Sequence, residues 1–389
     1  MIILSPILAN AHRLEGFTEK LPTLLFQRFA MQQMPFTQLQ ALVLDSGGLF
    51  PNQFTEGETC VLHAPLLRKL ELSALASDGT TRSFLDCHSG TPCIKIPWSQ
   101  LTHFSSKYND LSKESFVDFS VFLSQMPNLE TFILQEHELY NRHANWKVQD
   151  GKQRYSFKRL KTLRVLAPHS VMFPLLAIMQ TPHLEHLNLE LQDGPRAEGV
   201  LCPDDYEDGG DMMGAWERKF VNGITGLLNT LENRSSVTSL GLWCFQRLPV
   251  VNIVKQLPSL RRLAMSDLEE ELTDFLSSGW NKDLGTSASR TFPDLQSLTF
   301  EIDWYSKKAL DKPHGTNKRI LQTIEDRLKT GQEVKLERVR IMYESFGRGI
   351  LKDAFLDPLA KWTDASSSHR IWLEPVEIDM IHGKLLFID

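Results

Sequence analysis

The sequence predicts an α/β fold built from one repeated helix-and-strand unit, and three observations predict it. Leucine makes up roughly 15% of the residues, above its usual share. A six-residue pattern with leucine or a substitute at positions one, four and six returns ten times. Proline stands shortly before five of these copies. A small apolar module that recurs in this way is typical of stacked repeats, in which each unit contacts its neighbours.

The repeated motif is best seen in LETFIL, LEHLNL and LQSLTF. Between the first six copies the starting positions are 24 to 34 residues apart, close to the period of leucine-rich repeats and their longer variants. The irregular spacing predicts an irregular leucine-rich-repeat solenoid, or horseshoe. The ten copies begin at Leu39, Leu67, Leu101, Leu129, Leu160, Leu184, Val237, Leu260, Leu295 and Leu336.

Each copy predicts a strand, because alternate side chains of a strand point to opposite faces of the sheet. In LETFIL, this places Phe132 and Leu134 inward and Thr131, Ile133 and Gln135 outward. We expect the strands to stack in parallel on the concave face, with the helices on the convex face.

An apolar run before each motif predicts the helix of the unit. The runs FVDFSVFLSQM and PVVNIVKQL end just before Pro127 and Pro258. A residue that precedes proline is disfavoured in the helical region, so the helix ends there. Each unit is therefore expected to run from helix to proline stop to strand.

The repeats extend over almost the whole chain, so we expect a single domain over residues 1–389. Residues 192–215 interrupt the pattern and are expected to form an inserted surface loop, followed by a helix in WERKFVNGITGLLNTLE. A second polar interruption, 281–290, is expected to be a mobile loop. Residues 357–389 contain a helix-like segment and apolar strands, and we expect them to cap the last repeat.

Composition excludes several classes of function. Lys plus Arg number 42 and Asp plus Glu 48, a formal net charge of −6, so nucleic acid is not an expected partner. The five cysteines are scattered without a CxxC pair, which indicates a reducing compartment. No secretory signal or membrane-spanning run is visible. We therefore expect a cytoplasmic or nuclear protein without a membrane partner.

The sequence contains no strong catalytic or metal-binding motif. His183 and His186 are three apart on a predicted strand and point to opposite faces, which is poor geometry for a shared metal. The acidic segment 204–211 lacks the pattern of a calcium loop, and no phosphate-binding loop or nucleophile elbow occurs. We expect no catalytic residue, no metal and no cofactor. A hydrolase with a Cys–His pair formed in space stays open as a remote alternative.

The outward side chains of the strands are the candidate binding residues, because packing does not require them. Trp243 stands out: a large aromatic residue beside Gly241 on a concave face resembles an interface anchor, although a core tryptophan is the open alternative. We expect a protein partner to bind this face. The candidate residues are Trp243, Arg164, Asn188, Glu190, Arg262, Glu301, Lys69 and Glu71.

Several longer stretches together carry a family resemblance. They are LANAHRLEGF from Leu8, IPWSQLTHF from Ile96, the forms QMPNLETFIL and QTPHLEHLNL, and ILQTIEDRLKTGQEVKLERVRI from Ile320. The chain resembles the leucine-rich-repeat region of the F-box protein family of mushroom-forming (basidiomycete) fungi. The resemblance implies a non-enzymatic protein that selects substrates for an F-box type ubiquitin ligase.

The F-box of that family, a short helical module that opens with a sequence of the LPPEIL type, is not visible. LPTLLFQRFA from Leu21 lacks its continuation and is expected to be the helix of the first repeat. A Skp-type adaptor is therefore an expected partner only if an F-box is encoded upstream. The alternative is a ligase-independent repeat scaffold or receptor. In either case we expect a monomer.

Overall fold

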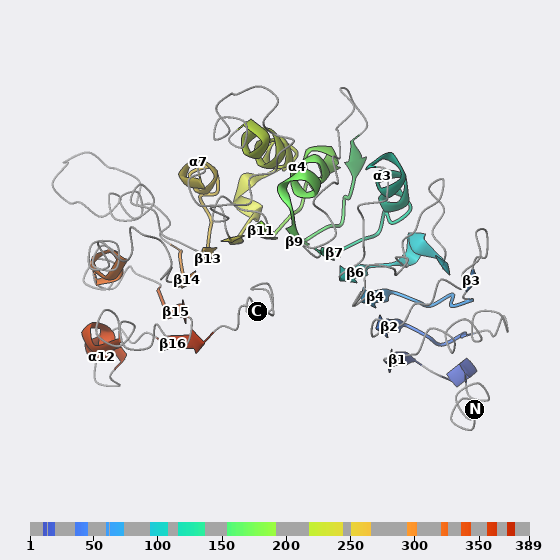
Figure 1. Ribbon diagram of the computed structural model, residues 1–389, viewed down its shortest axis with the longest axis horizontal. Helices are drawn as coiled ribbons and strands as arrows, with labels where there is room; N and C mark the ends of the chain where they lie inside the picture. Colours follow the sequence, from blue (N-terminus) through green and yellow to red (C-terminus); the bar gives the residue numbers. More distant parts are fainter. Residues whose placement is uncertain are drawn as a thin grey trace, which may run out of the picture. The chain divides into compact units, whose positions relative to one another are not determined.

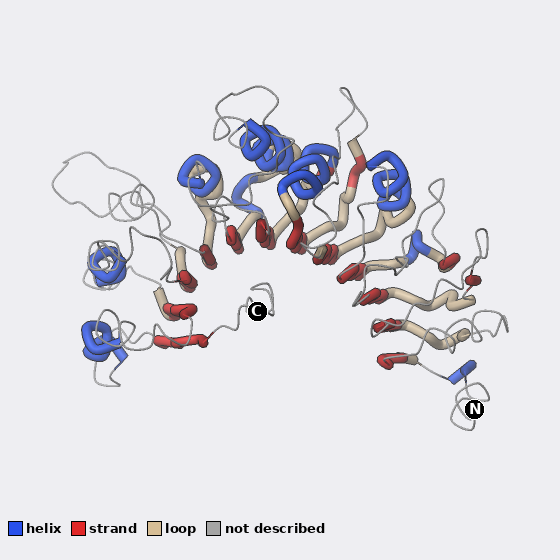
Figure 2. The backbone as a smooth tube through the Cα atoms, in the orientation of Figure 1, coloured by secondary structure: helices blue, strands red, loops and turns tan. Residues whose placement is uncertain are grey.

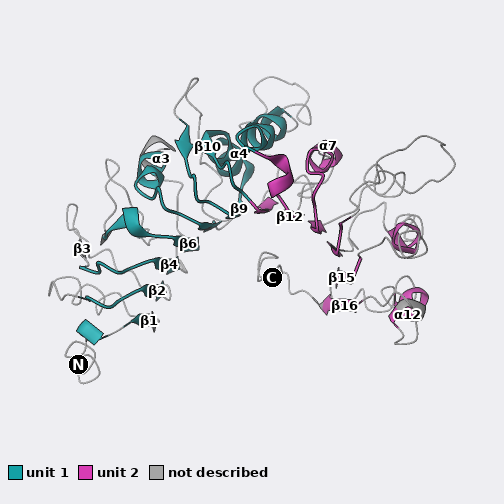
Figure 3. Cartoon of the chain, turned by 180° about the vertical axis from the view of Figure 1, so that it is seen from behind, with its two compact units in different colours: residues 1–184, 202–232 teal, residues 185–201, 233–389 magenta. Residues whose placement is uncertain are grey.

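The structure is a computed structural model of the chain, and it describes the regular elements and the turns beside them (Figure 1). By contact density the chain divides into two compact units: unit 1 is 1–184 with 202–232, and unit 2 is 185–201 with 233–389 (Figure 3). The described residues are 11–13, 15–19, 36–45, 60–61, 63–73, 94–107, 116–136, 154–191, 218–243, 250–265, 294–301, 320–325, 336–343, 356–363 and 372–377.

Unit 1 holds a parallel sheet in the order β1-β2-β4-β6-β7-β9 and two short parallel pairs, β3 with β5 and β8 with β10. The helices α3 and α4 lie on the same side of the sheet (Figure 2). The strands are β1 (Gly16–Glu19), β2 (Ala41–Asp45), β3 (Cys60–Val61), β4 (Lys69–Ser73), β5 (Ile94–Lys95), β6 (His103–Lys107), β7 (Thr131–Gln135), β8 (Tyr155–Ser156), β9 (Thr162–Ala167) and β10 (Met179–Gln180). The helical segments are η1 (Ala11–Arg13), η3 (Trp98–Gln100), α3 (Phe116–Ser124), α4 (His169–Ile178), the π-helical η5 (Val221–Thr225) and α6 (Gly226–Leu228).

Unit 2 holds a second parallel run of strands in the order β11-β12-β13-β14-β15-β16. The strands are β11 (His186–Leu191), β12 (Ser239–Trp243), β13 (Arg262–Met265), β14 (Ser297–Glu301), β15 (Arg338–Tyr343) and β16 (Trp372–Glu377). The helical segments are η6 (Arg234–Ser236), α7 (Val250–Val254), α12 (Asp357–Thr363) and a turn of helix over 320–325.

All ten copies of the sequence motif contain a strand, and each strand begins at the third residue of its motif. The strand register keeps the copies aligned: Leu70 pairs with Phe104, and Phe104 pairs with Phe132. The described residues therefore form a mixed α/β structure with extensive parallel pairing, as the motif predicts. Six of the described strands lie outside the ten copies: β1, β16 and the short strands β3, β5, β8 and β10.

A forked backbone hydrogen bond links consecutive motifs. The carbonyl of the second motif residue accepts from two successive N–H groups of the next motif, so that the Thr102 oxygen receives Glu130 at 2.7 Å and Thr131 at 3.0 Å. The Glu130 oxygen receives Lys161 and Thr162 in the same way, and in unit 2 the Arg261 oxygen receives Gln296 and Ser297. The fork satisfies backbone groups at the entry to each strand and fixes the register there.

The proline before a motif lies inside a turn. The N–H of Leu129 donates to the carbonyl of Met126 at 3.3 Å, and Leu67 donates to Ala64 at 3.1 Å, which closes a four-residue turn around the proline between them. Proline suits the second position of such a turn, because its fixed φ matches the turn. It ends the preceding helix, as expected from the sequence, and also directs the chain into the strand.

The apolar motif positions form the core, as the alternation predicts. The first, fourth and sixth residues are buried in each described copy, whereas Lys69, Thr131 and Arg262 at third positions keep part of their surface exposed. In unit 1 the core includes an aromatic group in which Phe122 meets Trp98 edge to face, with ring centroids 4.8 Å apart. Phe104 lies 5.7 Å from Phe122.

The helix predictions are confirmed where residues are described. The run before Pro127 forms α3, the run before Pro258 contains α7, and WERKFVNGITGLLNTLE is helical from residue 218 to 228. The loops predicted over 192–215 and 281–290, and LPTLLFQRFA, lie outside the described residues.

In the terminal segment 357–389, α12 and β16 are formed, and β16 pairs in parallel with β15 along its whole length. Copies of the motif lie in both units. The single domain over 1–389 stays a prediction. Among the helices described, none is long and apolar enough to cross a membrane.

Candidate functional site

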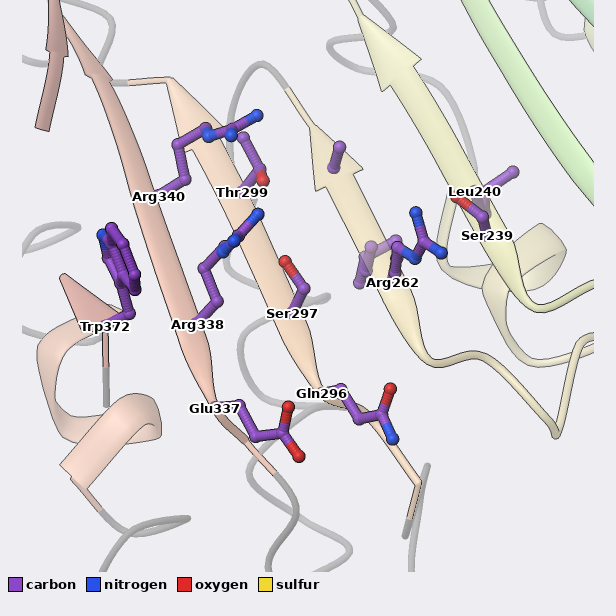
Figure 4. A pocket seen from close by; sticks show the side chains of 12 residues that line it. Ser239, Leu240, Arg262, Gln296, Ser297, Thr299, Glu337, Arg338, Arg340 and Trp372 are labelled. Atoms are coloured by element: carbon purple, nitrogen blue, oxygen red, sulfur yellow. The ribbon is translucent and has the colours of Figure 1, made fainter. Parts of the chain in front are cut away.

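A groove with a volume of about 290 Å³ lies on the outward face of β12–β16, within unit 2 (Figure 4). It is lined mainly by side chains at the third and fifth motif positions, the positions that packing leaves available. The strand register arranges these side chains in rows across the sheet. The first row is Ser239, Arg262, Ser297, Arg338 and Trp372, and the second row crosses Ala264, Thr299 and Arg340 and continues to Glu374.

Small side chains form the floor of the groove. On β14, Ser297 lies between Arg262 and Arg338, and Thr299 lies between Ala264 and Arg340. Thr299 lines the groove and is 7% exposed. The side chains of Arg338 and Arg340 extend from β15 toward β14, where the short side chains of Ser297 and Thr299 leave room for them (Figure 4).

Two of the three arginines have identified partners on β16. Arg340 forms a two-point contact with the carboxylate of Glu374, with Nε 3.1 Å from Oε2 and Nη2 3.4 Å from Oε1. The guanidinium carbon of Arg338 lies 5.7 Å from the ring centroid of Trp372, a cation–π contact. The indole of Trp372 is itself 65% exposed. Such contacts hold both arginines in defined orientations, because each restricts side-chain freedom.

The groove concentrates positive charge in an acidic chain. Its lining includes Arg262, Arg338 and Arg340, whereas the carboxylates next to them are Glu337, at the end where the strands begin, and Glu374. The chain as a whole has a formal net charge of −6. The groove is therefore suited to an anionic group, because guanidinium groups bind oxyanions by charge-assisted hydrogen bonds.

Of the residues expected from the sequence to bind a partner, Arg262 lines the groove and is exposed. Glu301 ends β14, and the structure describes its backbone only. The sequence alone left open whether Trp243 is an anchor or a core residue, and the structure supports the core alternative. Trp243 is fully buried and packs with Ala264, Met342 and the partly buried Val376.

Asn188 and Glu190 on β11 are also buried, with 5% and 6% of their surfaces exposed. The register places Glu190 beside Trp243 and Asn188 beside Gly241. Both side chains are covered and offer little surface to a partner.

The remaining candidates lie in unit 1. Lys69 is exposed at the start of β4, and Arg164 is partly buried on β9. Glu71 is engaged in an ion pair, with its Oε1 2.6 Å from Nζ of Lys107 on β6. These side chains line the outward face of their own sheet and are not in the groove.

Sequence reasoning missed Trp372 and Glu374, which orient two of the groove arginines. β16 carries no copy of the motif, so its outward positions could not be assigned by counting from a leucine. The alternation in IWLEP was the available signal, since it separates Trp372 and Glu374 from Leu373.

The structure brings together no metal site in the part of the chain it describes: no group of three or more His, Cys, Asp or Glu side chains could hold an ion. His183 lies 3.8 Å from Glu232, and His186 lies 4.0 Å from Glu185. Cys87, Cys93, Cys202 and Cys244 fall outside the described residues, so a Cys–His pair stays an untested alternative.

In comparisons with protein-family models and with curated proteins, the chain matched no family model and no curated protein.

Proposed function

We propose that this chain is a leucine-rich-repeat solenoid that binds another protein through the outward face of its parallel strands. One observation carries the proposal: ten motifs each begin a strand at the same position, so that within each unit their third and fifth side chains fall on one face of the strands. The fourth and sixth side chains of these motifs are buried. A regular face with side chains that the core does not need is typical of repeat proteins that bind other proteins.

The composition of this face supports a binding role. It carries exposed or partly exposed Lys69, Thr131, Arg262, Arg338 and Trp372. Arginine and tryptophan are enriched among residues that dominate the energy of protein interfaces. A catalytic role has no comparable support among the described residues.

The proposal is tested by affinity purification of partners with the full-length chain, followed by quantitative binding. Alanine at Arg262 and Trp372 should weaken binding of a recovered partner, each by about tenfold or more if it is an interface anchor. Lys219→Gln serves as a control, because Lys219 is exposed on the helical segment that precedes η5. Binding that is lost equally in the control, or in none of the strand-face variants, would contradict the proposal.

A more specific role, substrate selection for an F-box type ubiquitin ligase, is supported by the family resemblance of the sequence stretches given above. The test is co-purification of a Skp-type adaptor with the chain and with the protein extended by any upstream coding sequence. Recovery of the adaptor by either form supports the role. If neither form recovers it while a partner still binds the strand face, the chain is a ligase-independent scaffold or receptor.

A further inference from the structure

We propose that the groove on β12–β16 binds an acidic side chain of an extended peptide segment, with the anionic group between Arg262 and Arg338. This inference rests on the proposed protein-binding function and names the chemistry of the segment that binds. The peptide need not be phosphorylated, because carboxylate and phosphate share the oxyanion geometry that guanidinium groups recognise.

The register fixes the geometry of the anion position. Arg262 pairs with Ser297, and Ser297 pairs with Arg338, so the two arginines lie on either side of one serine. Neighbouring strands are about 4.8 Å apart, which separates the two arginine backbones by about 10 Å. Two guanidinium groups on long side chains can both reach an oxyanion held above Ser297 at that spacing, and its hydroxyl can donate to the same group.

The neighbouring side chains favour the binding of one anion between Arg262 and Arg338. Arg340 is already engaged by Glu374, so its charge is largely balanced within the sheet. Arg338 is held against the indole of Trp372, which orients the guanidinium and supplies no negative charge. Arg262 is exposed and reachable from solvent. The first row of the groove therefore places two guanidinium groups on neighbouring sides of Ser297, where a carboxylate can accept hydrogen bonds from both.

The exposed indole of Trp372 suits a ligand that is part of a peptide, because a peptide can place an apolar side chain beside its anionic group. With 65% of its surface exposed at the end of the arginine row, it offers an apolar surface beside the anion position. A volume of about 290 Å³ is enough for about one or two side chains. We therefore expect an acidic residue with an apolar or aromatic neighbour in the bound segment.

The test is selection of random peptides displayed on phage against the full-length chain, followed by affinity measurement on the selected peptides by fluorescence anisotropy. We expect enrichment of Asp or Glu next to an apolar residue. Replacing that acidic residue by Gln should weaken binding by about tenfold or more, as for loss of a hydrogen bond to a charged group. Replacement by phosphoserine distinguishes the two oxyanions: retained or tighter binding shows that the groove accepts both.

Matched variants connect the selected peptides to the groove. Arg262→Gln and Arg338→Gln should each weaken binding by about tenfold. Arg261→Gln removes the same charge one residue away, at an exposed side chain that does not line the groove, and should change affinity by less than about twofold. Circular dichroism of each variant checks that the fold is retained.

The outcomes separate the two proposals. The groove assignment is overturned if the selected peptides lack acidic enrichment. It is also overturned if the peptides bind the Arg262 and Arg338 variants as tightly as the Arg261 control. If those peptides instead lose affinity in Lys69→Gln or Arg164→Gln, protein binding by the strand face stands and only the groove fails. If no peptide responds to any strand-face variant, or if none is selected, the groove and the proposed function both fail.

Discussion

At the scale of single residues, a side chain at an outward strand position is not always exposed to solvent. Asn188 and Trp243 both occupy strand positions that point away from the leucine core, yet they are 5% and 0% exposed. The amide atoms of Asn188 and Nε1 of Trp243 are buried without hydrogen-bond partners in the described part of the chain. Such groups cost stability, because they lose water and gain no replacement for it.

Asn188→Leu should raise the free energy of unfolding by about 1–3 kcal/mol, because it replaces a buried amide with an apolar side chain. Asn188→Asp should lower it, since a carboxylate at the same place would be a buried charge. Urea denaturation followed by circular dichroism measures both. A leucine variant less stable than the parent would show that the amide is satisfied in solution.

Trp243→Ala should lower the free energy of unfolding by about 3–5 kcal/mol, because the indole fills space beside Ala264 and Met342. Trp243→Phe should cost less, since it keeps most of the apolar contact and removes an N–H without a partner among the described residues. The measurement is thermal unfolding of the three proteins. If the alanine variant is as stable as the parent but binds a partner more weakly, Trp243 is an interface anchor and not a core residue.

At the scale of elements, the helical segment of η5 and α6 packs closely on α4. A Cβ added at Gly223 would lie 3.0 Å from Cβ and 3.1 Å from Cα of Phe173. At Gly226, the nearest atom is Cα of Ala177 at 3.8 Å, an ordinary contact. A side chain larger than hydrogen is therefore excluded by close packing at Gly223 but not at Gly226, although both glycines lie in the same helical segment.

Gly223→Ala should lower the free energy of unfolding by about 1–3 kcal/mol, because the helix must move away from the α4 backbone. Gly226→Ala is the matched control and should raise it by about 0.5–1 kcal/mol, because alanine has the higher helix propensity and space is available. Chemical denaturation of both variants tests the pair. Equal effects of the two substitutions would contradict the close approach at Phe173.

At the scale of the whole molecule, the proposed repeat architecture makes stability a sum over neighbouring repeats. Phe104 is fully buried and contacts Trp98, Phe122 and Phe132 within unit 1. Removal of the Phe104 ring should therefore destabilise the nearest strands, β4, β6 and β7, more than the others.

Phe104→Ala should accelerate hydrogen exchange in β4, β6 and β7 and leave β13–β15 close to their original protection. The local cost expected from a large cavity is about 3–5 kcal/mol. Hydrogen exchange followed by mass spectrometry provides the comparison. Equal loss of protection in both units would instead identify one cooperative domain, as the sequence alone predicts.

The sequence by itself determined the repeated element. Leucine or a substitute at motif positions one, four and six, with proline before five of the copies, was enough to locate ten strands and their inward residues, because burial of alternate side chains is a local pattern. It also placed Arg262, Arg338 and Arg340 on the outward face.

Only the tertiary structure decided which outward side chains meet and which remain exposed. Trp372 and Glu374 belong to a strand without the motif, and their contacts with Arg338 and Arg340 depend on the register between β15 and β16. Trp243 is covered by residues about a hundred positions away in the chain, such as Met342. Alternation along one strand specifies a face, whereas coverage of that face depends on neighbours brought together by the fold.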